Sequence, residues 1–262
     1  MGEIATERSG AVLRVQFNRP EKKNALTVSM YQAVADQLDA AAKDDDIRVV
    51  LLYGAGDSFS AGNDIADFLK NPPSGDDSPQ ARFTEALMDF DKPLIAAVHG
   101  VAIGSGATML THCDFVYAAE HTTFQLPFVN LAVVPELGTS YSLAAQLGYL
   151  AAAELLLLGL PFDARRASDL GVVTRIVPDA DVLATAMETA QRLTRLPAGA
   201  LQASKRLMKR DSRERTAAAV KAENLEFAAR VRSADAKEAL TAFLEKRRPD
   251  FSKTKAAAAT GQ

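Results

Sequence analysis

Cysteine and histidine are scarce in this sequence. Cys113 is the one cysteine, so the chain cannot close an internal disulfide or build a cysteine-based metal site. The three histidines, His99, His112 and His121, include no His-x-x-x-His pair of the kind that favours a zinc site. We therefore expect no metal, and we interpret Cys113 and the histidines as structural residues.

Neither sign of charge dominates, and no apolar run is long. The 262 residues carry 30 basic and 33 acidic side chains, and this net charge of −3 argues against a general nucleic-acid-binding protein. The most apolar stretch, residues 94–110, is interrupted by three glycines and is too short for a membrane span. No secretory signal or Ser-Lys-Leu address is visible. We expect a cytoplasmic protein with no nucleic-acid or membrane partner.

An ordinary globular composition, 48% hydrophobic and 24% charged, excludes a largely disordered chain. Periodicity predicts strands at 4–8, 11–17, 49–53, 94–98, 115–119 and 172–177. Helices are expected at 28–43, 65–69, from 80, at 140–158, and after Pro178 almost to Arg248. This alternation predicts an α/β core over residues 1–195 and a helical region over 196–250. Residues 71–79 and 251–262 are expected to be a mobile loop and a flexible tail.

Two glycine-containing loops each follow a buried strand and precede a helix. They are residues 59–65 (FSAGNDI) and residues 99–108 (HGVAIGSGAT). Free N–H groups at such a strand exit can bind an anion, and two of them converging on one carbonyl oxygen form an oxyanion hole. An ordinary turn capped by Asp64, or close backbone packing, explains the loops equally well. Met109 stands where a dinucleotide-binding loop needs its third glycine, which disfavours that function.

The two loops, in this order, resemble those of the crotonase (enoyl-CoA hydratase/isomerase) superfamily. Asn18-Arg19-Pro20, Asn24-Ala25-Leu26 and Leu170-Gly171-Val172-Val173 extend the resemblance over about residues 4–250. It implies a crotonase-like spiral of repeated strand-strand-helix units with a helical C-terminal trimerisation region. It also implies an enoyl-CoA thioester substrate, a homotrimer or hexamer, and no cofactor beyond the CoA of the substrate.

The same resemblance implies the site residues. The backbone N–H groups of Asn63 and Ser105 would stabilise the oxyanion. The implied substrate-binding residues are Lys23, Asn24, Ala25, Leu26, Ala61, Gly62, Asp64, Ile65, Gly104 and Phe128, of which Phe128 would line the acyl pocket. Many relatives hold a CoA phosphate with a lysine where this chain has Ala66, and Lys22 or Lys23 could supply that charge here.

The expected reaction depends on one carboxylate. Hydratases of the superfamily use two glutamates, and Thr108 and Phe128 stand at their positions, so hydration by that pair is not supported. The segment 134–141, which contains Pro135-Glu136, resembles the peroxisomal-type Δ3,Δ2-enoyl-CoA isomerases, whose base is this glutamate. We predict that Glu136 transfers a proton from C2 to C4, which shifts the double bond from C3 to C2. Apolar neighbours would favour its protonated form.

Alternatives to this function stay open. The chain could be a hydratase, catalyse another crotonase-superfamily reaction, or bind acyl-CoA without catalysis. From the residues alone, Glu136 could also be a solvent-facing acid in the first turn of a helix. Asp114 is interpreted as structural. The basic residues 205–215 are interpreted as a solvated or interfacial face of a C-terminal helix.

Overall fold

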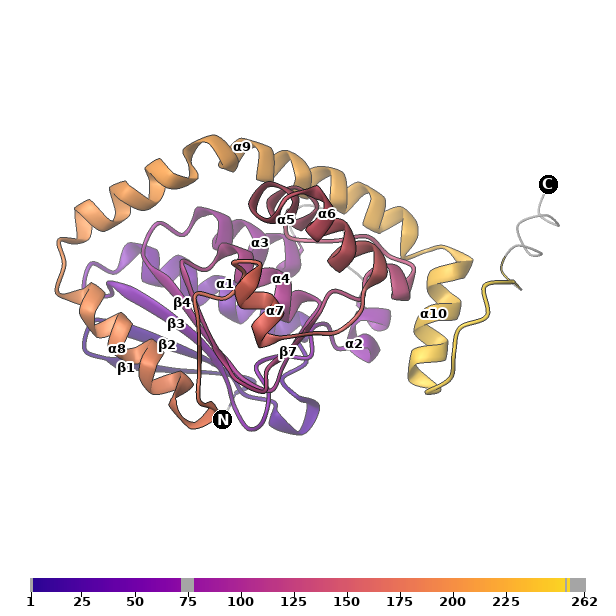
Figure 1. Cartoon of the computed structure of the whole chain (residues 1–262), viewed down its shortest axis with the longest axis horizontal. Coiled ribbons are helices and arrows are strands. Elements are labelled where there is room, and N and C mark those ends of the chain that lie inside the picture. Colours follow the sequence, from indigo (N-terminus) through magenta and orange to yellow (C-terminus); the bar gives the residue numbers. More distant parts are fainter. Residues whose placement is uncertain (1, 72–77, 253, 255–262) are drawn as a thin grey trace.

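The computed structural model describes residues 2–71, 78–252 and 254 of the chain (Figure 1). Most of the loop predicted over 71–79 and most of the tail predicted over 251–262 lie outside the described residues.

Two β-sheets form the centre of the molecule. The larger contains β1 (Ile4–Ser9), β2 (Val12–Phe17), β3 (Val49–Gly54), β4 (Leu94–Val98), β6 (Phe115–Ala119) and β9 (Arg175–Val177), in that order. All its pairs are parallel except the β1–β2 hairpin. The smaller sheet contains β5 (Val101–Ile103), β7 (Thr123–Gln125) and β8 (Phe162–Asp163).

The chain alternates between the two sheets. Only residues 99–100 separate β4 from β5, and only residues 120–122 separate β6 from β7, yet the members of each pair belong to different sheets. In each of these two passes the chain adds one strand to each sheet, and a helix follows β5. The strand-strand-helix architecture expected from the sequence is confirmed.

Helices cover both faces of the larger sheet (Figure 1). The α-helices of the described residues are α1 (Val28–Lys43), α2 (Ile65–Lys70), α3 (Pro79–Asp89), α4 (Ser105–Thr108), α5 (Thr139–Leu147), α6 (Tyr149–Ala153), α7 (Ala164–Asp169), α8 (Val182–Thr194), α9 (Ala198–Arg230) and α10 (Ala234–Leu244), the last of which lies away from this sheet. A short 3₁₀ helix, η2 (Met109–His112), follows α4. Within the described parts of the chain, none of the helices combines the length and apolar character that a membrane crossing requires.

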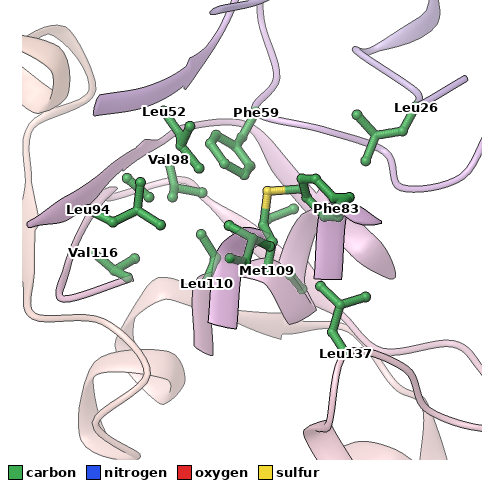
Figure 2. Packing of buried hydrophobic residues seen from close by; sticks show 14 of the residues in the cluster. Leu26, Leu52, Phe59, Phe83, Leu94, Val98, Met109, Leu110, Val116 and Leu137 are labelled. Carbon is green, nitrogen blue, oxygen red and sulfur yellow. The ribbon is translucent and has the colours of Figure 1, made fainter. Parts of the chain in front are cut away.

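Strand β3 shows why the strands are apolar on both sides. Val50 and Leu52 face the main core, and Val49, Leu51 and Tyr53 belong to a second cluster that packs against α8. In the main core, Met109 lies among Phe59, Phe83, Leu110 and other side chains (Figure 2). A parallel sheet covered on both faces requires such continuous apolar runs, which is how the sequence reveals these strands.

Two predicted elements are shorter than expected. The helix predicted over 140–158 breaks at Gly148, whose backbone lies at φ 82° and ψ 154°, outside the helical region. The strand predicted over 172–177 begins only at Arg175. The N–H groups of Val172 and Val173 instead donate to Ala167 O and close the end of α7.

Lys205 corrects the interpretation of the basic helix face. It is buried, and its Nζ lies 2.7 Å from Asp114 Oδ2 and 2.8 Å from the carbonyl oxygen of Lys92. Asp114 also accepts from the Leu94 N–H at 2.7 Å, so its structural role is confirmed. This ion pair attaches α9 to the edge of the core. Neighbouring Arg206 is exposed and pairs with Asp91, as expected for a solvated face.

Removing the buried cation should therefore destabilise the fold. We expect Lys205→Met to lower the free energy of unfolding by about 3 kcal/mol, because Asp114 keeps a buried charge without its partner. The control Arg206→Met breaks an exposed pair and should cost less than about 1 kcal/mol. Urea denaturation at one fixed protein concentration measures both. Equal small losses would show that the Lys205 pair does not anchor α9.

Candidate active site

The two glycine-containing loops lie side by side. Ser60 N–H donates to Val101 O and Ile103 N–H donates to Ser60 O, both at 3.0 Å, so the first loop runs along β5. Gly62 has φ +80°, and a Cβ on it would lie 2.5 Å from Ile103 O. Only glycine permits this backbone conformation and this approach. The structure therefore places the two glycine-containing loops in direct backbone contact.

Two backbone donors at this junction are unused. Within the described residues, neither the N–H of Asn63 nor that of Ser105 donates a hydrogen bond to another group of the chain. Ser105 is the first residue of α4, where helix geometry leaves the N–H without an intrahelical acceptor. Neither N–H therefore has an acceptor within the described part of the chain, and their role as oxyanion donors stays a prediction.

The segment 23–26 borders the first loop. Ala61 N–H donates to Lys23 O at 2.9 Å, and Leu26 N–H donates to Gly62 O at 2.7 Å. The Asn24 side chain is fully buried and donates to the carbonyl oxygens of Ala55 and Ser58. Its side chain therefore holds the loop, and any contact with a ligand here comes from the exposed neighbours. Ala25 is partly exposed beside it.

Asp64 caps α2. One of its oxygens accepts from the N–H groups of Ala66 and Asp67, and the other lies 3.1 Å from Arg19 Nη2. Burial alone would raise the pKa of Asp64, but the hydrogen bonds from the Asp67 N–H and from Arg19 outweigh it, and the net pKa is lowered. Asp64 is therefore an ionised cap rather than a proton donor. This is the structural role that the sequence left open.

Glu136 lies in the connection between β7 and α5 and is not a solvent-facing helix acid. Ser105 Oγ donates a hydrogen bond to Glu136 Oε1, and Thr108 Oγ1 lies 3.5 Å from the same oxygen. The carboxyl group thus sits beside the residue whose N–H is one of the two free donors. From the sequence, only the backbone N–H of Ser105 was expected to take part in the site. The structure shows that its side chain also contacts Glu136.

The proton affinity of Glu136 suits proton transfer near neutral pH. Burial raises its pKa from 4.5 to about 7, and the negative charge of Glu223 raises it as well. The hydrogen bonds from Ser105 and Thr108 lower it but do not cancel this effect. A carboxyl group with a pKa near 7 can both accept and return a proton at neutral pH.

Tyr31, on α1, contacts Asn63 and lines the same cavity as Glu136. Its hydroxyl donates to Asn63 Oδ1 at 2.7 Å, and its ring packs edge-on against Phe83 with centroids 5.1 Å apart. Burial, followed by the charge of Glu136, raises the pKa of Tyr31 well above its usual range, so it stays a neutral donor. The phenol therefore orients the Asn63 side chain beside the carboxyl group.

Two cavities meet at this point. One, of about 360 Å³, is lined by residues that include Tyr31, Asn63, Thr84, Glu136, Leu137 and Phe227. The other, of about 100 Å³, is lined by residues that include Ala61, Gly62, Asn63, Ile65, Gly104, Phe128, Leu240 and Phe243. Asn63, Phe68 and Phe227 border both, and the two rings meet edge-on at 5.8 Å. Glu136 borders the larger cavity and Phe128 the smaller.

A sequence pattern describing the enoyl-CoA hydratase/isomerase family matches residues 7–254. The chain belongs to the enoyl-CoA hydratase/isomerase family. It is 32% identical over 250 residues to enoyl-CoA delta isomerase 2 of Rattus norvegicus, covering 93% of this chain and 64% of that protein. The chain thus spans less than two thirds of that relative.

Relatives of matching length bear other names. The chain is 32% identical to 2,3-dehydroadipyl-CoA hydratase of Escherichia coli over 96% of its own length and 99% of that protein. The solved structure of Pseudomonas aeruginosa OdaA superposes with a TM-score of 0.90 at 44% identity, covering 92% of this chain and 98% of that one. The family therefore includes similar chains named for isomerisation and for hydration.

Sequence reasoning missed three residues that lie around the Glu136 segment. Tyr31 reads as one apolar position of an amphipathic helix, and Glu223 as one acid of a long charged helix. His112, interpreted as structural, is buried with a pKa of about 4, and its Nε2 lies 2.9 Å from Leu137 O. No local pattern marks these residues, because α1, η2 and α9 bring them to the Glu136 segment only in the fold.

The raised pKa of Glu136 makes stability depend on pH. Between its unfolded value of 4.5 and its folded value of about 7, the folded state binds a proton that the unfolded state has lost, so stability falls as pH rises. Glu136→Gln removes the titrating group and therefore this decrease in stability with pH. We expect the variant to match the wild type near pH 4 and to exceed it by about 2–3 kcal/mol near pH 8.

Denaturant titrations across this pH range measure the difference. The control Glu214→Gln changes an exposed glutamate on α9 and should leave the profile unchanged. A constant difference between Glu136→Gln and the wild type at all pH values would mean that the Glu136 carboxyl is ionised normally.

Proposed function

We propose that this chain is an enoyl-CoA isomerase that shifts a double bond from C3 to C2 of the acyl group. The observation that carries the proposal is the position of Glu136. It is a carboxyl group with a pKa of about 7, on the wall of a cavity and hydrogen-bonded to Ser105, beside two unused backbone donors. A single base next to an oxyanion hole suffices for this reaction.

The reaction proceeds in two proton transfers. Ionised Glu136 removes a proton from C2 of the 3-enoyl thioester, and the released electron pair moves onto the thioester oxygen. The N–H groups of Asn63 and Ser105 stabilise that oxyanion. The electrons then return, a double bond forms between C2 and C3, and C4 takes the proton from Glu136. The carboxylate is regenerated, and no atoms are gained or lost.

The two cavities suggest how the substrate lies. The thioester oxygen would occupy the junction at Asn63, with the acyl chain in the larger cavity beside Glu136 and the pantetheine end in the smaller one. This arrangement assigns Phe128 to the pantetheine end rather than to the acyl pocket expected from the sequence. Lys22 and Lys23 are exposed next to the first loop, and neither ammonium group pairs with another described residue. We assign them to the phosphates of CoA, in place of a lysine at position 66.

Hydration is the second candidate, favoured by the hydratase relative that matches along its full length. Adding water requires a group that activates it as well as one that protonates the substrate. Glu136 is the sole carboxylate among the described residues lining the larger cavity, and its neighbours Ser105 and Thr108 are hydroxyls. This supports isomerisation over hydration.

The decisive substitution is Glu136→Gln, which preserves size while removing the base. We expect isomerisation of 3-enoyl-CoA to fall by at least about 10²-fold, with CoA binding retained. Wild-type kcat should also decline below about pH 7, as Glu136 becomes protonated. Absorbance of the 2-enoyl thioester follows the reaction directly.

A parallel assay with 2-enoyl-CoA and water separates the candidates. The isomerase proposal expects slow hydration that does not approach the isomerisation rate. Wild-type hydration far faster than isomerisation would support the hydratase, and an unchanged rate in Glu136→Gln would exclude this residue as the base. CoA binding without any turnover would support a binding protein.

We also propose that the chain assembles into a trimer or a hexamer of paired trimers. Five large apolar residues, each at least half exposed, lie close together in sequence at α6 and just after it: Tyr149, Leu150, Leu157, Leu158 and Leu160. An apolar patch of this kind marks a protein–protein contact. We therefore assign this apolar patch to the interface between copies.

Charging the apolar patch should dissociate the assembly. We expect Leu150→Glu to convert the trimer or hexamer into monomers in analytical ultracentrifugation, because Leu150 is 83% exposed and an interface would bury the new charge. The control Leu69→Glu changes an exposed leucine of α2, outside both the patch and the C-terminal helical region, and should leave the assembly intact. A monomeric wild type would refute the assignment.

A further inference from the structure

Glu223 of α9 holds the segment that follows Glu136. Its Oε2 accepts from the N–H of Gly138 at 2.6 Å, and its Oε1 accepts from the N–H of Ser140 at 2.8 Å. Glu223 is only 5% exposed, although it belongs to a helix whose surface is mostly polar. A carboxylate that accepts with both oxygens needs no proton, so this geometry suits its ionised form.

The two contacts replace a missing helix cap. Gly138 occupies the N-cap position of α5 and has no side chain to accept from the first turn. A glutamate 83 residues further along the chain satisfies Ser140 instead. The carboxylate also lies at the positive end of the α5 dipole, where negative charge is stabilised. The start of α5 is thus defined by α9 rather than by its own sequence.

The captured segment is an unusual piece of backbone. Leu137 and Gly138 both have positive φ, 58° and 75°, and Leu137 pays a steric cost for this conformation that glycine avoids. His112 contacts the carbonyl oxygen of Leu137 from one side, and Glu223 takes the next N–H from the other. Glu136 precedes this turn directly, so the turn decides where its carboxyl group points.

Glu223 also brings a second negative charge near Glu136. The hydroxyls of Ser105 and Thr108 on α4 contact the Glu136 carboxyl, and Glu223 on α9 and Tyr31 on α1 lie near enough to interact with its charge. His112 on η2 contacts the carbonyl oxygen of the next residue, and Lys221 on α9 lines the same cavity. Tyr31 and His112 are neutral at pH 7, and Lys221 is exposed at the cavity wall. Glu223 is therefore the buried charge in this set that disfavours ionised Glu136.

We propose that Glu223 is a positioning residue for Glu136: it fixes the turn that aims the Glu136 carboxyl group and places a like charge behind it. The inference rests on the proposed function, in which Glu136 transfers the proton. It adds a residue on α9 that does not touch the substrate but sets the geometry of the base and the pH range in which the base works.

The primary test titrates Glu136 itself and does not depend on turnover. The protein is labelled with glutamate carrying ¹³C at the side-chain carboxyl, and the Glu136 resonance is identified by its loss in Glu136→Gln. In Glu223→Gln, which keeps the shape of the side chain and removes its charge, the pKa of Glu136 should fall by about half a unit or more. The matched control Glu226→Gln, an exposed position on the same helix, should leave it unchanged.

Kinetics test the positioning role. In Glu223→Gln, kcat for 3-enoyl-CoA should fall about tenfold or more while KM changes little, since the base is misaimed but the binding cavity remains. The acidic limb of the kcat profile should move to lower pH together with the titration. Glu223→Asp retains the charge but is too short to reach both N–H groups, so it should lose kcat with a smaller shift in pH dependence.

The outcomes separate this inference from the proposed function. An unchanged pKa of Glu136 in folded Glu223→Gln, or wild-type kcat in folded Glu223→Asp, would overturn the inference while leaving the isomerase proposal intact. Wild type without isomerase activity would refute the proposed function, and the titration would still decide the effect of Glu223. If Glu223→Gln does not fold, the kcat of Glu223→Asp decides between positioning and a purely structural role.

Discussion

The close contact between two backbone segments organises this molecule. The first glycine-containing loop runs beside β5 through two reciprocal hydrogen bonds of Ser60, at a separation that only a glycine at position 62 permits. Since β4 and β5 belong to different sheets, this contact lies where the two sheets meet. It sets the loop that contains Asn63 against the strand that leads to Ser105, and the segment 23–26 pairs with the same loop.

A second constraint is the burial of carboxyl groups. Glu136 and Glu223 are both withdrawn from water, and burial raises the pKa of each. The two carboxyl groups have different hydrogen-bond donors. Glu223 receives two backbone N–H groups and stays an acceptor, whereas Glu136 receives hydroxyl donors and keeps a pKa near 7. Neighbouring acids thus acquire different chemical roles from their surroundings.

Helix α9 links the stability of the fold to the geometry of the site. Near its start, Lys205 is held by Asp114 at the edge of the main sheet, and further along, Glu223 and Phe227 reach the Glu136 segment and the wall between the cavities. A helix of 33 residues can span both places as one rigid element. The C-terminal region therefore contributes to the walls of the candidate site as well as forming a helical extension.

The sequence by itself determined the strands, the two glycine-containing loops and Glu136, because continuous apolar runs, glycines at strand exits and a characteristic Pro-Glu segment are local signals. It also led to the family, which the comparisons confirm. The tertiary structure alone decided that Lys205 is buried, that Asn24 holds a loop, and that Tyr31, His112 and Glu223 lie around the Glu136 segment. These roles arise from contacts between residues far apart in the chain. Helical periodicity cannot predict them, because it is the same whether a polar side chain faces solvent or a distant backbone N–H.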